Sequence, residues 1–374
     1  MIYEFLKRID TKDKIGKRII SSLITEENRV KLGQCLKDGF RRRMIRQVSD
    51  ARTSHIKDLL QVCLQHISPV TTPLALVSQF SCSGGPLLTQ LLDGHSRLYA
   101  YPCASAVDAP GNDLWPTIDI EGQPIEWFNI ITKALPISGL RESSRQGEED
   151  NARFPFIFLP ILQKQIFNKY LQSVQPLNTR HVFDAHMTAC FGAWLDYQNH
   201  GLDKKFVTVY APGLSSQNQV GNSFFEIYPD GRLIAIIRDP VHWFVSASRF
   251  EPQIYGDIES ALNHWQESVR IATRIRKKFE DRVCLIKFED LVSQTESVMR
   301  FLSEFLGIPY EDNLLQPTFN GIAIQPLNGQ KSGNDDTRDN SVVESNKLDK
   351  EKQKLIKKMT DADYQAALRE VVVL

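Results

Sequence analysis

The stretch Leu233-Ile234-Ala235-Ile236-Ile237-Arg238-Asp239-Pro240 decides the fold of this chain. Five consecutive apolar residues are typical of a strand that is covered on both faces, in the middle of a parallel sheet. Arg238 then stands at the carboxyl end of the strand, where open α/β sheets bind ligands, and its planar guanidinium suits phosphate oxygens. Pro240 can begin the next helix, because a missing N–H costs nothing there, and Ser246 comes two turns later. We therefore predict that Arg238 and Ser246 converge on one phosphate.

A second strand, loop and helix lie upstream. Residues 73–80 (PLALVSQF) predict a strand, which runs into Ser81-Cys82-Ser83-Gly84-Gly85-Pro86 and then into a helix over residues 87–95. Free backbone N–H groups and the positive end of the helix dipole meet at such a helix start, which makes an anion site. The alternative is a glycine-rich turn that only packs the helix on the sheet. The loop lacks the Gly-Lys-Ser/Thr ending of a Walker loop.

Two further strands complete the pattern. Residues 205–211 predict one, and residues 283–287 predict another, which ends in Phe288-Glu289-Asp290-Leu291 and is followed by a helix that Gly307 terminates. We expect Glu289 and Asp290 to hold loops. Strands that alternate with helices over residues 73–333 predict an α/β fold, with a central parallel sheet and helices on both faces.

These segments resemble, in their order along the chain, the sulfotransferases that use 3′-phosphoadenosine 5′-phosphosulfate (PAPS). The Arg-Asp-Pro run with Ser246 is similar to the family's 3′-phosphate-binding strand and helix. Ser83, Gly84 and the Leu87-Leu88 pair are similar to its 5′-phosphosulfate loop. The resemblance is closest to bacterial sulfotransferase-like proteins. It implies the P-loop-like sulfotransferase fold, PAPS as co-substrate, and no metal.

The resemblance also implies which residues hold the donor. They are Cys82, Ser83, Gly84, Gly85, Pro86, Leu87, Arg238, Ser246, Lys331 and Ser332. Lys331 and Ser332 follow residues 317–321 (PTFNG), which are similar to the family's last nucleotide-contacting loop; a solvated loop is the alternative there.

The chain departs from the family pattern in four places. Cys82 stands where the family has Arg or Lys, and Gly85-Pro86 stand where it has two threonines. The family's base would fall near Ala104 and its assisting lysine near Tyr210, and neither residue can serve.

A replacement acid–base group must therefore come from elsewhere. His186 titrates in the useful range when unperturbed, and Asp184 is the second candidate. The alternative is structural, with Asp184 capping a helix whose first turn contains His186. Asp119, beside aromatic residues that could line an acceptor pocket, is a weaker candidate, and we expect His95 to close the first helix.

Two functions remain open at this point. One is a cytoplasmic sulfotransferase that transfers a sulfuryl group from PAPS to a hydroxyl or amine acceptor. The other is a catalytically inactive protein with the sulfotransferase fold, which binds a nucleotide or a partner. The intact pair of Arg238 and Ser246 favours nucleotide binding in both.

Composition sets the remaining bounds. A net charge of +0 gives no case for nucleic acid as a partner. We find no apolar run near the roughly 20 residues of a membrane-spanning helix and no signal-peptide core. The 6 cysteines form no CxxC pair, which favours reduced thiols in a cytoplasm.

We expect three regions along the chain. Residues 1–70 form a helical N-terminal extension, residues 71–333 the α/β domain, and residues 334–374 a polar linker and a C-terminal helix. The two extensions are where a second copy or another protein could bind.

Overall fold

The computed structural model describes residues 60–104, 115–137, 156–201, 203–213, 218–324 and 348–372, together with residues 54, 57 and 58. The chain divides into one unit of residues 1–66 and another of residues 67–374. Residues 60–65 of the first unit are helical. Every element described below belongs to the second unit.

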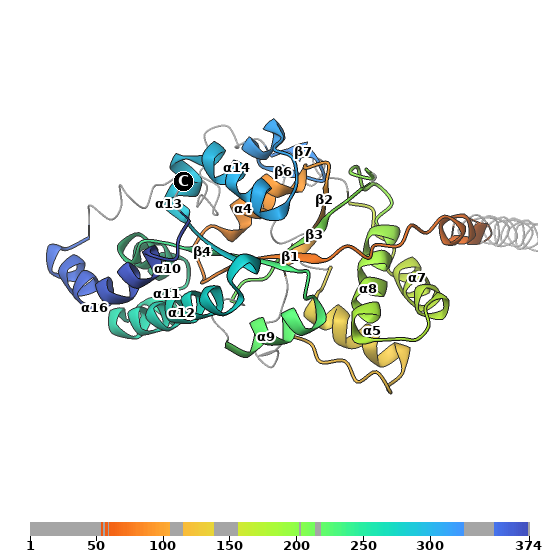
Figure 1. Cartoon of the computed structure of the whole chain (residues 1–374), viewed down its shortest axis with the longest axis horizontal. Helices are drawn as coiled ribbons and strands as arrows, with labels where there is room; N and C mark the ends of the chain where they lie inside the picture. Colours follow the sequence, from red (N-terminus) through yellow and green to blue (C-terminus); the bar gives the residue numbers. More distant parts are fainter. Residues whose placement is uncertain are drawn as a thin grey trace, which may run out of the picture. The chain divides into compact units, whose positions relative to one another are not determined.

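A five-stranded parallel sheet forms the centre of this unit (Figure 1). Its order is β2-β3-β1-β4-β5, with β1 at Leu74–Gln79, β2 at Leu98–Ala104, β3 at Phe206–Tyr210, β4 at Arg232–Ile237 and β5 at Val283–Lys287. The predicted parallel sheet is confirmed. Because β1 and β4 are neighbours with Gln79 opposite Ile236, the segments that follow them start side by side.

Helices cover both faces of the sheet (Figure 1). One face carries α4 (Gly85–Asp93), α13 (Phe288–Ser293) and α14 (Thr295–Leu306), and the other carries α10 (Pro240–Phe250), α11 (Pro252–Tyr255), α12 (Ile258–Phe279) and α16 (Lys350–Leu368). Along β4, Ile234 and Ile236 enter the first core, whereas Ala235 and Ile237 enter the second. Burial on both faces is why β4 is apolar from Leu233 to Ile237.

The remaining elements surround this sandwich. They are α5 (Pro124–Ala134), α7 (Pro160–Ser173), α8 (Thr179–Ala193), α9 (Asn218–Ile227), the short helices η2 (Glu280–Arg282) and η3 (Asp312–Leu315), and a hairpin of β6 (Thr318–Phe319) and β7 (Ile322–Ala323). Helix α8 packs against α7 and α5. Gly307 ends α14 in the left-handed conformation, at φ 61°, as predicted.

The C-terminal helix is part of the sandwich. Ile356 and Ala367 of α16 are fully buried in the core that α10 and α12 share. Beyond α16, Val371 pairs with Leu285 of β5 in parallel, and the backbone N–H of Val372 donates to the Leu285 carbonyl (3.1 Å). The last residues of the described chain therefore occupy the outer edge of β5.

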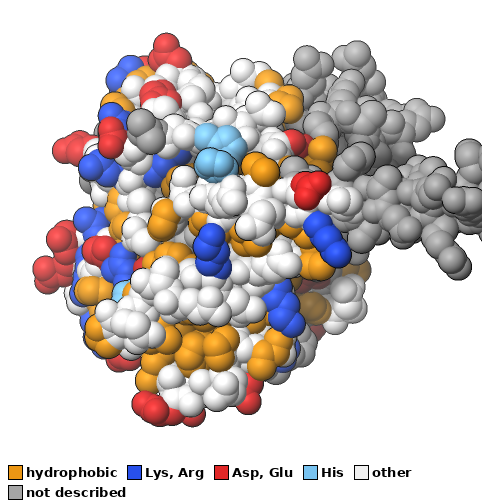
Figure 2. Space-filling model, turned by 90° about the vertical axis from the view of Figure 1, so that its right-hand side faces the viewer, with side chains coloured by type: hydrophobic (Ala, Val, Ile, Leu, Met, Phe, Trp, Pro, Cys, Tyr) orange, Lys and Arg blue, Asp and Glu red, His pale blue; other side chains and the backbone are white. Residues whose placement is uncertain are grey.

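The surface shows no strong separation of charge on the face seen in Figure 2. Among the described residues there, Lys and Arg side chains are interspersed with Asp, Glu and hydrophobic groups. In the same described ranges, we find no helix with the length and hydropathy needed to cross a bilayer.

Candidate functional site

The loop between β1 and α4 has the tight backbone that an anion-binding turn requires. Cys82 adopts φ 63°, and Gly84, the residue before α4, adopts φ 94°. A Cβ atom on Gly84 would lie 2.2 Å from Cδ2 of Phe288, so only glycine fits there. Pro86 lies in the first turn of α4, as predicted. The sequence thus folds into the expected strand, loop and helix.

Gln79, the last residue of β1, occupies the inside of this loop. Its side-chain oxygen accepts hydrogen bonds from the backbone N–H of Ser83 (3.0 Å) and of Gly85 (2.5 Å). Its amide nitrogen donates to the Tyr210 hydroxyl (2.6 Å). Gln79 is buried. Two of the backbone donors that would face an anion are therefore already bonded to a side chain of the chain itself.

Arg238 stands at the carboxyl end of β4, directly beside the loop. The side chain is 1% exposed, and its Nη1 donates to the Cys82 carbonyl (2.6 Å). Its guanidinium carbon lies 4.3 Å from the centre of the Phe288 ring, in a cation–π contact. Ser246 lies on α10, two turns after Pro240 begins it, and is also buried. The strand, arginine, helix and serine are arranged as predicted; their convergence on a phosphate stays a prediction.

Glu289 fixes the start of α10 next to Arg238. Its carboxylate accepts from the backbone N–H of Asp239 (2.9 Å) and lies 3.5 Å from Nδ1 of His242. Burial alone would raise the pKa of Glu289, but the hydrogen bonds from His242 and Asp239 outweigh it and lower the pKa. Asp239 in turn caps α10 through the N–H groups of Val241 and His242. The predicted loop-holding role of Glu289 is confirmed.

His186 lies inside the protein. Its side chain is 0% exposed, and its Nε2 contacts the Tyr101 hydroxyl (3.2 Å) and the Cys190 sulfur (3.3 Å). Burial lowers the pKa of His186 to about 3, so the imidazole is neutral near pH 7. A ring without exposed surface does not reach an acceptor in this structure.

Asp184 lies near the amino end of β4, whereas Arg238 lies at its carboxyl end. Its carboxylate accepts from the hydroxyl of Tyr228, which precedes β4, whereas Arg238 follows β4. A strand of this length spans about 20 Å. The expected cap is also wrong: α8 begins at Thr179, and Asn178 caps it by accepting from the N–H of His181 (3.0 Å). The structure therefore does not bring Asp184 to the carboxyl end of β4, where Arg238 lies.

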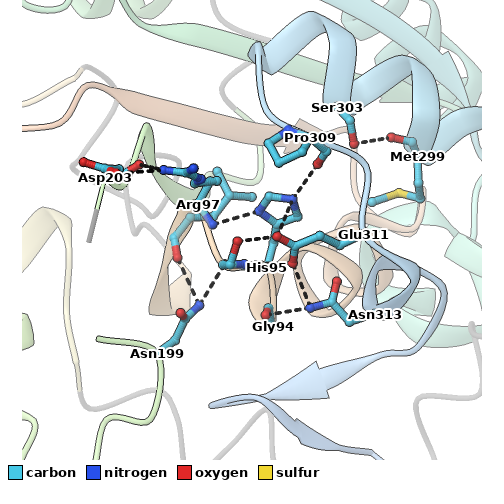
Figure 3. A network of polar contacts seen from close by, with 12 residues as sticks. Gly94, His95, Arg97, Asn199, Asp203, Met299, Ser303, Pro309, Glu311 and Asn313 are labelled. Carbon is cyan, nitrogen blue, oxygen red and sulfur yellow. Dashed lines mark hydrogen bonds and ion pairs between the residues drawn. The ribbon is translucent and has the colours of Figure 1, made fainter. Parts of the chain in front are cut away.

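His95 has the structural role expected of it, at the end of α4 (Figure 3). Its Nδ1 accepts from the backbone N–H of Arg97 (3.0 Å), so its Nε2 carries the proton and donates to the Pro309 carbonyl (2.8 Å). Glu311 accepts from the backbone N–H of Ser96 (3.1 Å) and also bonds its hydroxyl. The network ties the end of α4 to the segment after α14.

Other predicted residues lie away from the loop or outside the described ranges. Asp119 is exposed, and its carboxylate accepts from the backbone N–H of Glu121 (3.1 Å). Lys331 and Ser332 lie outside the described residues. Within the described ranges, no group of three or more His, Cys, Asp or Glu is placed to hold a metal ion.

Sequence reasoning missed the roles of Gln79 and Phe288. Gln79 lies within a predicted strand, as the last residue of β1, and Phe288 directly follows the predicted strand β5. A polar residue that ends a buried strand just before a glycine-rich loop is the signal that could have identified Gln79.

The chain was compared with known proteins. The model of the sulfotransferase family matches residues 80–312, which is more than half of the chain. This range contains the loop, Arg238 and Ser246. No curated protein matches the sequence.

Solved sulfotransferase structures match the fold at low identity. The sulfotransferase domain of the Synechococcus PCC 7002 olefin synthase is 17% identical, with a TM-score of 0.46 over 83% of this chain and 97% of its own. The domain from the curacin biosynthetic pathway is 16% identical, with a TM-score of 0.45 over 79% and 99%. A mouse sulfotransferase in complex with PAP is 10% identical, with a TM-score of 0.39 over 83% and 94%.

The match of the family model covers the loop and helix that follow β1, and the strand, turn and helix at β4. By this match, the chain belongs to the sulfotransferase family.

Proposed function

We propose that the chain binds an adenosine nucleotide with a 3′-phosphate at the carboxyl ends of β1 and β4. The observation that carries this proposal is the buried Arg238, which lies beside the loop before α4 and is followed by α10, the helix that carries Ser246. A buried guanidinium is a costly group unless anions or dipoles offset its charge, and a phosphate at this edge would do so. The residues that would hold the 3′-phosphate are Arg238 and Ser246.

We further propose that the nucleotide is PAPS and that the chain transfers its sulfuryl group to a hydroxyl or amine acceptor. PAPS supplies the activated sulfuryl group. The chain's part is to fix the nucleotide through Arg238 and Ser246, and to place positive backbone dipole at the start of α4. Deprotonation of the acceptor needs a group that reaches the acceptor, and neither His186 nor Asp184 does so in this structure.

A second function has its own supporting observation. Gln79 fills the loop that would face the 5′ side of the nucleotide, and Cys82 supplies no cation there. Both features suit a catalytically inactive member that binds a nucleotide or a partner without transferring sulfate.

Calorimetry with adenosine 3′,5′-bisphosphate tests the binding proposal. Loss of charge-assisted hydrogen bonds to a buried phosphate costs about 1.5–3 kcal/mol, so Arg238→Ala should weaken binding by about 10- to 150-fold. Ser246→Ala removes less and should weaken binding by several-fold. Arg232→Ala is the matched control, because Arg232 lies at the amino end of β4, the end away from Arg238. Equal affinities for the wild type and Arg238→Ala would refute the 3′-phosphate site.

Transfer is tested separately. The wild-type protein is incubated with PAPS that carries labelled sulfate and with a panel of sugar, lipid, peptide and small-metabolite acceptors. Label in an acceptor supports the enzyme. Tight binding of the bisphosphate without transfer to any acceptor supports the binding protein.

A further inference from the structure

The side-chain oxygen of Gln79 occupies the position in the loop where an anion would bind. An anion at a helix start is held by free backbone N–H groups. Here the N–H groups of Ser83 and Gly85 both point at one acceptor, the Gln79 Oε1, at 3.0 and 2.5 Å. A single oxygen that accepts from two amides of the turn, two residues apart, has the position that a phosphate oxygen would take.

Tyr210 holds Gln79 in this position. The Tyr210 hydroxyl accepts from Nε2 of Gln79 (2.6 Å), which fixes the orientation of the amide with its oxygen toward the loop. Gln79 and Tyr210 end the neighbouring strands β1 and β3, so the sheet itself sets their spacing. Gln79 is only 4% exposed, and water therefore competes little for these bonds.

Gly85 completes the arrangement. A Cβ atom at this position would lie 2.4 Å from Cε2 of Tyr210 and 3.1 Å from Cδ of Gln79. Any larger residue would therefore displace the tyrosine ring or the glutamine amide. The position of Tyr210 and Gln79 therefore depends on Gly85, because a glycine leaves room for both of their side chains.

We propose that Gln79, positioned by Tyr210, competes with the 5′ phosphate of the nucleotide for the backbone donors of Ser83 and Gly85. The inference rests on the proposed nucleotide binding. The site then selects its ligand mainly through the 3′-phosphate and gains little affinity from a phosphate at the 5′ position. Gln79 and Tyr210 are specificity-determining residues in this scheme, and a 5′ phosphate binds the loop fully only when Gln79 leaves it.

The ratio of two affinities measures this competition. Calorimetry gives the affinities of adenosine 3′,5′-bisphosphate and of adenosine 3′-monophosphate, and their ratio reports what the 5′ phosphate contributes. In the wild type we expect the two affinities to agree within about threefold. In Gln79→Ala the freed amides can donate to the phosphate, and the ratio should rise by about tenfold or more.

Two matched variants sharpen the test. Tyr210→Phe keeps the ring beside Gly85 but removes the hydroxyl that orients Gln79, so the ratio should rise by less than in Gln79→Ala. Gln79→Glu keeps the size of the side chain and places a carboxylate on the same donors, so the ratio should stay at or below the wild-type value. Thermal melts confirm that each variant is folded, and Tyr210→Phe provides the test if Gln79→Ala is not.

The outcomes separate this inference from the proposed function. A wild-type ratio above about tenfold that Gln79→Ala leaves unchanged would overturn the competition while nucleotide binding stands. If neither nucleotide binds the wild type or any folded variant, the proposed function fails and the inference fails with it.

Discussion

The buried carboxyl of Asp184 predicts a measurable dependence of stability on pH. Its side chain is 5% exposed, and burial raises its pKa to about 7 from an ordinary 3.8. Arg180 and Tyr228 act in the opposite direction. Arg180 offsets the burial only in part, because its guanidinium is already bonded to both carboxylate oxygens of Asp230, at 2.7 and 3.1 Å.

The sign and size of the effect follow from linkage. Between about pH 4 and pH 7 the folded protein keeps a proton on Asp184 that the unfolded chain has lost. The contribution of this group to stability is therefore fully present below pH 4 and is lost as the pH rises to 7. Each pH unit is worth about 1.4 kcal/mol, so the loss between pH 5 and pH 8 is about 2–3 kcal/mol.

Asp184→Asn removes this loss, since the amide does not ionise. Urea unfolding of the wild type and the variant at pH 5 and pH 8 gives the difference in free energy of unfolding at each pH. The difference should shift by about 2–3 kcal/mol in favour of the variant at pH 8. A difference that is the same at both pH values would refute the reasoning.

The wild type has to be compared with Asp184→Asn at each pH, because His186 changes the free energy of unfolding with pH in the opposite direction to Asp184. Burial lowers its pKa to about 3, so the unfolded chain takes up a proton before the folded one does. Its contribution to stability is lost as the pH falls below about 6.5. The two groups nearly cancel between pH 4 and pH 6.5, and the pH profile of the wild type alone would hide both.

Three further predictions concern packing. His186→Ala should lower the free energy of unfolding by about 2 kcal/mol or more, because it empties a fully buried site, while calorimetry should find the nucleotide affinity unchanged. Gly85→Ala should lower it by about 1–3 kcal/mol, because the new Cβ meets the Tyr210 ring, and thermal melts of Gly85→Ala with and without Tyr210→Ala should show the second change recovering part of the loss. Ile356→Ala should lower the free energy of unfolding in urea by about 2–4 kcal/mol, because Ile356 is fully buried. Arg270→Ala should lower it by less than about 1 kcal/mol, because the Arg270 side chain is 57% exposed although it bonds Asp363 at 2.7 Å. Equal losses would show that the ion pair, not burial, holds α16.

The sequence predicts four strands of the sheet and misses β2, which lies at one edge. The central strands β1 and β4 are buried on both faces, so hydrophobicity alone marks them. Strand β2 was not predicted, because Tyr101-Pro102 interrupts its apolar pattern. A proline is tolerated there because β2 lies at the edge of the sheet, where the register with β3 is also irregular.

The site was predictable only where its parts are local. Arg238, Asp239 and Pro240 follow one another, and the sequence shows how a strand delivers them to a helix. The bond between Gln79 and Tyr210 joins residues 131 positions apart, and no local pattern shows it. The start of α8 was placed too late for a different reason. Asn178 caps the helix well before the apolar run from Met187 onward on which the prediction depended.

The pairing of Val371 with β5 has a practical consequence for work on fragments. The range matched by the family model ends at residue 312, before α16 and before the residues that cover the outer edge of β5. A fragment cut there would remove the pairing of Val371 and Val372 with Leu285 and would uncover the apolar surface on which Ile356 and Ala367 pack. Bare strand edges beside apolar surface join to the same edges of other copies. We therefore expect a fragment that ends at residue 312, where the family match ends, to aggregate.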